Sequence, residues 1–249
     1  MSVIAILKES FEIVKKNPVL FVPMLVLTVI TALLSLIFIG SMIPFAGGFA
    51  GGFAGGEGDP GQMAAAAGAA MGGIFIVMII SAILGLVAHG MTVSMVDEAT
   101  RQEKATLKHG LDSAKKRLIP LIITAIVVGI IVGIGFVLLV LPGIILMFLF
   151  MFTVVAVMLD NENVFRAIGK SVRTVTKNFG AVLVMFLVLI ALGLIIALVD
   201  AIVGMIPILG VILTMIISAG YTAYVTAFIV LVYRGLQEKA PAEEPDAAV

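Results

Sequence analysis

The sequence contains no cysteine and no tryptophan, and only two of its 249 residues are histidine. Without cysteine, the chain has no disulfide, no thiolate metal ligand and no cysteine nucleophile. No nucleotide-binding loop, paired catalytic carboxylates or serine–histidine–aspartate set is apparent in the remaining residues. We therefore expect a protein that is not an enzyme and that holds neither a metal nor another cofactor.

Charged residues are also scarce, at 12% of the chain, and the 15 basic residues balance the 15 acidic ones. A soluble domain is about 25% charged and about 45–50% apolar. Here 62% of the residues are hydrophobic and the mean hydropathy is +1.28, which excludes a soluble fold. The zero net charge argues against a nucleic-acid partner, because nucleic-acid binding needs a surplus of Lys and Arg.

Long apolar runs are what the sequence has instead. A bilayer span needs roughly 17–25 mostly apolar residues. Six runs meet this length: Val19–Gly40, Gly73–Val96, Leu118–Leu141, Gly143–Leu159, Ala181–Val199 and Ile206–Leu231. The sequence therefore predicts an all-α integral membrane protein with six transmembrane helices. Pro142 and Gly143 are expected to form the turn between the third and fourth spans.

The positive charges indicate the orientation of these spans. All 15 Lys and Arg residues lie before residue 19, within 97–117, within 160–180 or after residue 231. The segments on the other side of the membrane carry none. The positive-inside rule then places both termini in the cytoplasm, in a multi-pass protein of the cell membrane. Glu9 and Glu12 among the first lysines argue against a cleaved signal peptide.

Each basic segment that precedes an odd-numbered span has apolar residues at helical spacing. The three stripes are Ile4, Leu7, Phe11 and Val14; Leu107, Leu111 and Ala114; and Phe165, Ile168, Val172 and Val175. Cationic residues occupy the opposite face, a pattern that is typical of helices lying in the membrane interface. We therefore expect three hairpins of transmembrane helices, each preceded by a cytoplasmic interfacial amphipathic helix.

These three segments also align without gaps. Ser10–Asn17 matches Gly110–Arg117 and Ser171–Asn178, with Lys16, Lys116 and Lys177 in register. One interpretation is a unit repeated three times about an axis along the membrane normal. The other is that any helix before a membrane entry is amphipathic and ends in lysine.

The first interpretation predicts a single six-span domain, 1–236, built from units 1–96, 101–160 and 163–236. A Gly/Ala-rich external loop is expected at 41–72, because its density of glycine resists a fixed helix. Within it, Met63–Ala70 could extend the second span as helix, since alanine favours helix. Residues 237–249 are expected to form a disordered cytoplasmic tail.

Basic residues at the ends of the three interfacial segments are candidate contacts for lipid headgroups. They are Lys15, Lys16, Lys115, Lys116, Arg117 and Lys177. Cations at this level attract anionic headgroups by roughly 1 kcal/mol each. The alternative is that these charges only set the topology.

A second candidate site lies inside the membrane. His89 is the ionisable residue deepest in a span, and Tyr221 and Tyr224 belong to a hydroxyl-rich part of the sixth span. Intramembrane ionisable groups are functional candidates, although a neutral histidine also serves as a hydrogen-bond partner between helices. Tyr233 is expected in the aromatic belt at the interface.

Several other positions have simple structural interpretations. Asp97 and Glu98, beside Arg101, are expected to form an exposed charge cluster. The segment 160–163 is expected to cap the third interfacial helix. Small residues at spacings of four are expected to pack helices within the bundle or, alternatively, between copies; they are Gly129 and Gly133, and Ala219, Ala223 and Ala227.

Three stretches carry a resemblance to a known group. They are the segment ending in Lys16-Asn17-Pro18, the turn Leu141–Ile144, and the segment Ala167–Asn178. The chain resembles six-span membrane proteins related to the membrane domain of glycerophosphoryl diester phosphodiesterases, including many uncharacterised archaeal members. The resemblance covers residues 1 to about 236. The phosphodiesterase catalytic domain has no counterpart here, so the resemblance implies no hydrolase activity.

Two functions remain open from the sequence. The leading hypothesis is a non-enzymatic component that organises lipids or partner proteins, with membrane lipids as its first partner and a protein partner or a second copy as another. The competing hypothesis is a transporter or channel for a small solute, based on His89 and the polar part of the sixth span.

Overall fold

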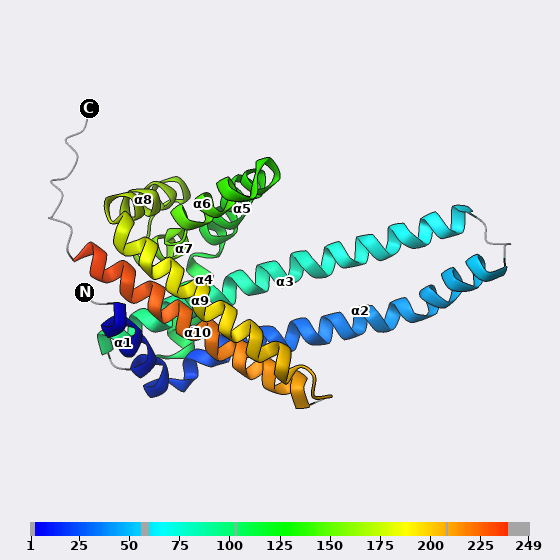
Figure 1. Ribbon diagram of the computed structural model, residues 1–249, viewed down its shortest axis with the longest axis horizontal. Coiled ribbons are helices and arrows are strands. Elements are labelled where there is room, and N and C mark those ends of the chain that lie inside the picture. Colours follow the sequence, from blue (N-terminus) through cyan, green and yellow to red (C-terminus); the bar gives the residue numbers. More distant parts are fainter. Residues whose placement is uncertain (1–2, 56–59, 103, 208, 239–249) are drawn as a thin grey trace. The chain divides into compact units, whose positions relative to one another are not determined.

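The computed structural model describes residues 3–55, 60–102, 104–207 and 209–238. Every regular element in these ranges is helical, which confirms the all-α fold (Figure 1). In chain order the elements are α1 (Val3–Lys16), η1 (Pro18–Phe21), α2 (Val22–Gly55), α3 (Pro60–Gln102), α4 (Leu107–Lys116), α5 (Leu118–Leu138), α6 (Val140–Leu149), α7 (Thr153–Leu159), α8 (Val164–Lys177), α9 (Phe179–Val203) and α10 (Leu209–Gln237).

Six helical stretches within the described residues are long and apolar enough to cross a membrane. They are Pro18–Phe38, Met71–Gln102, Leu118–Leu138, Val140–Leu159, Phe179–Val203 and Leu209–Gln237. Each contains most of one predicted span, so the number and positions of the apolar helices are confirmed. Their exact ends differ by several residues, because helix continues wherever the backbone can bond to itself.

The turn between the third and fourth stretches lies earlier than predicted. α5 ends at Leu138, and Leu139 is extended, with φ −163° and ψ 148°. Pro142 lies in the first turn of α6, where its missing N–H is not needed. Glycine is required here for a different reason: a Cβ at Gly135 would lie 3.1 Å from the Cα of Gly143. The two glycines therefore allow the α5 and α6 backbones to approach closely.

The fourth stretch is not one continuous helix. α6 ends at Leu149 and α7 begins at Thr153, with a turn between them. The hydroxyl of Ser171, on α8, lies at this break: its Oγ donates to the Leu149 carbonyl at 2.7 Å and accepts from the Phe152 N–H at 3.2 Å. A side chain from another helix thus replaces the missing backbone hydrogen bonds.

Most of the predicted external loop is helical. α2 continues to Gly55 and α3 begins at Pro60, so the loop prediction for 41–72 is wrong for the residues that the structure describes. Residues 56–59 lie outside the described residues. The expected extension of the second span over Met63–Ala70 is confirmed, in keeping with the high helix propensity of alanine. The predicted tail lies outside the described residues from 239 onward.

The chain divides into two compact units. One consists of Val26–Gly85, where α2 and α3 run alongside each other (Figure 1). Within it, the side chain of Phe38 lies against Gly73, and a Cβ at Gly85 would lie 3.7 Å from Leu27 Cδ2. The other unit contains α1, η1 and the chain from Leu86 onward.

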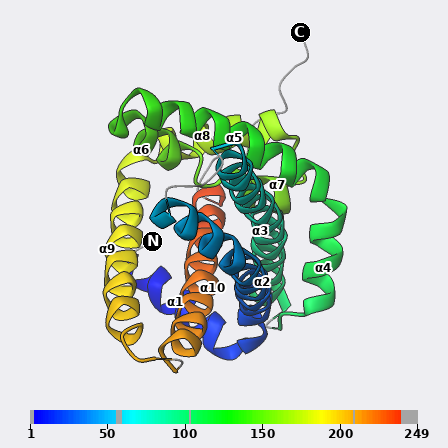
Figure 2. The same ribbon diagram turned by 90° about the vertical axis from the view of Figure 1, so that its right-hand side faces the viewer.

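The core of this second unit is built around the C-terminal half of α10. α1 and α9 pack against α10 (Figure 2). The small residues Ala219, Ala223 and Ala227 are buried, which confirms that this spacing serves packing within the bundle. Gly129 and Gly133 differ: a Cβ at either position would meet nothing within 4 Å in the described chain. The prediction that these two glycines pack within the bundle is therefore wrong.

Candidate functional site

The richest group of charged and polar contacts lies at the ends of three apolar helices. We call it the polar cluster. It consists of Asp97 and Arg101 near the end of α3, Asp160 directly after α7, Lys170 on α8, and Tyr233, Arg234 and Gln237 in the last turns of α10. All seven residues belong to the larger compact unit.

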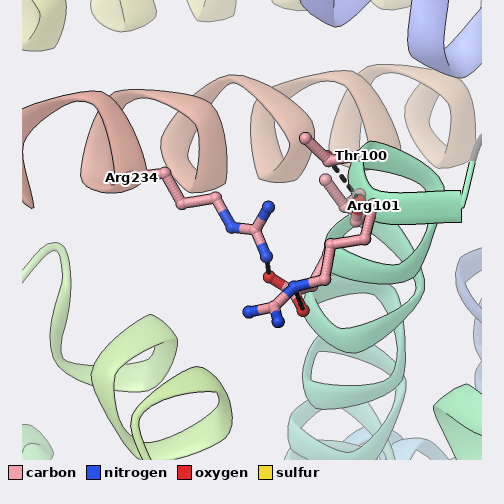
Figure 3. A network of polar contacts seen from close by, with 5 residues as sticks. Thr100, Arg101 and Arg234 are labelled. Atoms are coloured by element: carbon pink, nitrogen blue, oxygen red, sulfur yellow. Dashed lines mark hydrogen bonds and ion pairs between the residues drawn. The ribbon is translucent and has the colours of Figure 1, made fainter. Parts of the chain in front are cut away.

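Asp97 binds two arginines. Its Oδ2 lies 3.1 Å from Arg101 Nε one turn along α3, and its Oδ1 pairs with Arg234 Nη2 of α10. Figure 3 shows Arg101 and Arg234 converging from the two helices. The Asp97 and Arg234 side chains are only 15% and 22% exposed, whereas Arg101 is 66% exposed. The expected exposed cluster is therefore partly wrong, because Asp97 forms a largely buried ion pair.

Asp160 accepts from three side chains. Lys170 Nζ lies 2.7 Å from its Oδ2, Gln237 Nε2 donates to the same oxygen at 3.2 Å, and the Tyr233 hydroxyl also donates to it. Tyr233 is 1% exposed, and its ring lies 5.4 Å from that of Phe152. Tyr233 therefore does not face the surroundings as a residue of an aromatic belt would: its ring is buried in the protein, and its hydroxyl donates to the partly buried Asp160 carboxylate.

The polar cluster joins the ends of the second, fourth and sixth apolar stretches. Two neighbouring residues of α10 bind carboxylates from different elements: Tyr233 binds Asp160, which follows α7, and Arg234 binds Asp97 of α3. Each carboxylate has a cationic partner, which offsets the cost of removing its charge from water. The cluster is thus chemically suited to holding helices together. No group of three His, Cys, Asp or Glu side chains in the described chain could hold a metal ion.

The three basic helices α1, α4 and α8 bury the same positions of the sequence alignment. Ser10, Gly110 and Ser171 occupy one aligned position, and Val14, Ala114 and Val175 occupy the next turn; all six are buried. α4 shows how tight this contact is, because a Cβ at Gly110 would lie 2.6 Å from Met95 Cγ of α3.

The ends of α1 and α8 are also alike. Asn17 Nδ2 donates to the Ile13 carbonyl at 3.1 Å, and Asn178 Nδ2 donates to the Thr174 carbonyl at 3.0 Å. These asparagines are aligned residues, and each satisfies one of the free carbonyls at a helix end. Asn17 Oδ1 also accepts from the Ala105 N–H at 2.9 Å, which ties the end of α1 to the segment before α4.

The predicted headgroup contacts fall into two kinds. Lys15, Lys16, Lys115, Lys116 and Lys177 are exposed. Arg117 is half-buried, and its guanidinium donates to the backbone and side-chain oxygens of Asn161. Asn161 has a positive φ of 57°, which asparagine tolerates better than most residues. Asn163 follows as the residue before α8, without the side-chain hydrogen bond expected of a cap.

The predicted intramembrane residues contact different neighbours. The Tyr221 hydroxyl donates to the Leu189 carbonyl of α9 at 3.4 Å, and the Tyr224 hydroxyl donates to the Leu7 carbonyl of α1 at 3.2 Å. His89 lies partly buried on α3. The two tyrosines therefore tie α10 to α9 and α1, and neither hydroxyl bonds to His89.

Sequence reasoning missed the residues that organise the polar cluster. Asp160 was expected only as part of a helix cap, and Arg234 only as a topology-setting charge. The sequence did contain one indication, because an aspartate directly follows both the second and the fourth predicted spans, Asp97 and Asp160. No spacing in the sequence, however, connects either carboxylate to the end of α10.

Comparison with models of known families, with curated proteins and with solved structures gave no match. A functional assignment therefore depends on the residues of this chain alone.

Proposed function

We propose that the chain is a multi-pass membrane protein that binds anionic lipid headgroups through α1, α4 and α8. In this proposal it organises lipids or partner proteins in the membrane without catalysing a reaction. The observation that carries the proposal is that each basic helix has one face packed on the protein and exposed apolar side chains beside exposed lysines.

α1 illustrates the arrangement. Ile6 and Val14 face the protein and are buried, whereas Ile4 is 66% exposed and Phe11 is 57% exposed. An apolar side chain that faces away from the protein is stabilised when it enters the acyl boundary of a bilayer. The exposed lysines at the end of the helix then lie at headgroup level.

α4 and α8 likewise combine a face packed on the protein with exposed apolar and basic side chains. α4 exposes Leu107 and Leu111 beside Lys115, and α8 exposes Phe165, at 77%, beside Arg166. Each apolar stripe therefore ends in a buried residue but also carries exposed apolar side chains, which are Ile4, Phe11, Leu107, Leu111 and Phe165. Exposure of these side chains to water costs free energy, whereas their insertion into a membrane interface is favourable.

We further propose the architecture of three hairpins, each introduced by an amphipathic interfacial helix, with both termini in the cytoplasm. The matching burial of Ser10, Gly110 and Ser171 and the matching asparagine contacts at Asn17 and Asn178 support true repetition over generic membrane patterning. The distribution of Lys and Arg supports the orientation. The resemblance to six-span proteins related to a phosphodiesterase membrane domain agrees with this proposal and adds no catalytic role.

Lipid retention tests the proposed function. The protein is purified from membranes containing phosphatidylcholine and phosphatidylglycerol, and the lipids that stay bound are measured by native mass spectrometry. We expect preferential retention of phosphatidylglycerol. Replacing Lys15, Lys16, Lys115 and Lys116 together by glutamine is expected to weaken retention by about fivefold for each charge that faces a headgroup.

Arg101→Gln provides the control, because Arg101 is an exposed cation that already binds Asp97 and lies outside the three basic helices. It should leave lipid retention unchanged. Equal retention of both lipids by the wild type, or an equal loss in Arg101→Gln, would contradict the proposal.

Transport of a small solute is a second candidate, favoured by one observation. The hydroxyls of Thr124 and Thr153 are buried and make no hydrogen bond within the described chain, and Thr153 lies at the break in the fourth stretch. Broken helices with free polar groups form solute sites in many transporters. Solute uptake by proteoliposomes that is lost in Thr153→Val or His89→Ala would establish transport and displace the first proposal.

A further inference from the structure

α8 holds the short helix α7 at both of its ends. At the N-terminal end, the Ser171 hydroxyl bridges the Leu149 carbonyl and the Phe152 N–H. At the C-terminal end, the neighbouring Lys170 binds Asp160 at 2.7 Å. α7 has seven residues, so these two adjacent side chains span roughly 10 Å of helix.

The Ser171 bridge replaces hydrogen bonds that a continuous helix would make for itself. Phe152 would donate to the carbonyl four residues earlier, and Leu149 would accept from Thr153. Instead both groups bond to one hydroxyl, and Ser171 and Phe152 are fully buried. A buried backbone group without a partner is costly, and more so in an apolar environment, so the break depends on the position of α8.

Lys170 differs from the buried Ser171 in being accessible. Its side chain is 34% exposed, and it lies on the same helix as Arg166 and Arg173. Asp160 does not depend on Lys170 alone, since Tyr233 and Gln237 also donate to its carboxylate. When Lys170 leaves Asp160 for another anion, the carboxylate still keeps two hydrogen bonds.

We propose that the segment from Phe150 to Asp160 is a lipid-responsive joint. An anionic headgroup on α8 draws Lys170 away from Asp160, which releases the end of α7 from α8, while Tyr233 and Gln237 still hold Asp160, and loosens the Ser171 bridge at the break. This proposal rests on the proposed lipid binding and adds its consequence, because it connects the basic helices to the fourth apolar stretch.

Hydrogen–deuterium exchange of the Phe152 amide, whose N–H donates to the Ser171 hydroxyl, reads the bridge directly. The protein is placed in lipid discs of phosphatidylcholine alone or of an equal mixture with phosphatidylglycerol. We expect the wild type to exchange about fivefold faster in the mixture, the factor that corresponds to the loss of one ordinary hydrogen bond. Ser171→Ala should exchange at the faster rate in both discs. Lys170→Gln should also lose the difference between the two lipids.

Ser10→Ala is the matched control. Ser10 is the aligned serine of α1, but its Oγ donates to the Ile6 carbonyl of its own helix. The Phe152 amide of this variant should therefore exchange as in the wild type. Equal effects of Ser10→Ala and Ser171→Ala would overturn the bridge as the cause.

The two proposals fail in different ways. Native mass spectrometry of the same discs measures whether phosphatidylglycerol is bound. Bound phosphatidylglycerol with equal exchange rates in both discs would overturn the joint and leave the proposed function standing. Absence of bound phosphatidylglycerol would overturn both.

Discussion

Asp97 shows how much one side chain can depend on tertiary contacts. Its partner one turn away, Arg101, is mostly exposed, so that contact is screened by solvent. Its other partner, Arg234, comes from α10 and is mostly buried with it. Removing one member of such a pair leaves an uncompensated charge in a poorly solvated place, which costs more than the pair itself contributes.

We therefore predict that Asp97→Asn lowers the free energy of unfolding by about 2–4 kcal/mol, because Arg234 loses its carboxylate. Unfolding in mixed micelles with increasing dodecyl sulfate measures this change. Arg101→Gln is the control and should change stability by less than about 1 kcal/mol. An equal effect of the two variants would mean that the contact between α3 and α10 is unimportant.

At the scale of helices, small residues spaced four apart are buried in one helix and lie on an open face of another. Ala219 and Ala223 are buried in the packed half of α10, whereas a Cβ at Gly129 or Gly133 of α5 would meet nothing within 4 Å in the described chain. The sequence pattern is the same in both helices. Only the direction in which each face points decides whether small residues serve packing inside the chain.

Two glycines in the basic helices make this difference testable. A Cβ at Gly110 would lie 2.6 Å from Met95 Cγ and 3.1 Å from the Met91 carbonyl oxygen, whereas a Cβ at Gly169 would meet nothing within 4 Å. We predict that Gly110→Ala destabilises the protein by about 1–3 kcal/mol through overpacking. Gly169→Ala should instead stabilise it by about 0.5–1 kcal/mol, because alanine favours helix.

The same unfolding assay in micelles compares the two variants. If both variants were stabilised, α4 would not pack against α3 through Gly110. If both were destabilised, the exposed position of Gly169 on α8 would be wrong.

For the whole molecule, charge asymmetry is the property with the clearest consequence. The 15 cations lie on one side of the predicted membrane, while the chain as a whole has no net charge. Moving a lysine across a bilayer is expensive, so this distribution predicts one orientation. The polar cluster agrees with it, since three apolar helices end together at charged residues.

Because the chain contains no cysteine, single-cysteine variants test the orientation without further changes. We predict that Gly58→Cys reacts with a membrane-impermeant maleimide added to intact cells. Ser113→Cys, on α4, should react only after the cells are opened. Labelling of Ser113→Cys in intact cells would reverse the orientation and would place the basic helices outside.

The sequence by itself determined the properties that follow from composition and local order. Apolar runs of span length predict six helices wherever they occur, because an unpaired backbone is too costly in lipid. The same reasoning fails at local details: residues 41–55 and 60–72 are helical despite their glycines, and the fourth apolar run is broken after Leu149. In both cases the hydrogen-bond partners available to the backbone outweigh residue propensity.

Only the tertiary structure decided which polar residues meet. Asp97 and Arg234 are far apart in the chain, as are Asp160 and Tyr233. Ser171 bonds to the backbone at the break between α6 and α7, and no sequence motif predicts that break. Such pairs depend on how packed helices place their ends, and packing is a property of shapes that one-dimensional periodicity does not contain. Hydropathy thus defined the apolar helices and the charge distribution predicts their direction, whereas burial and distance defined the contacts that connect them.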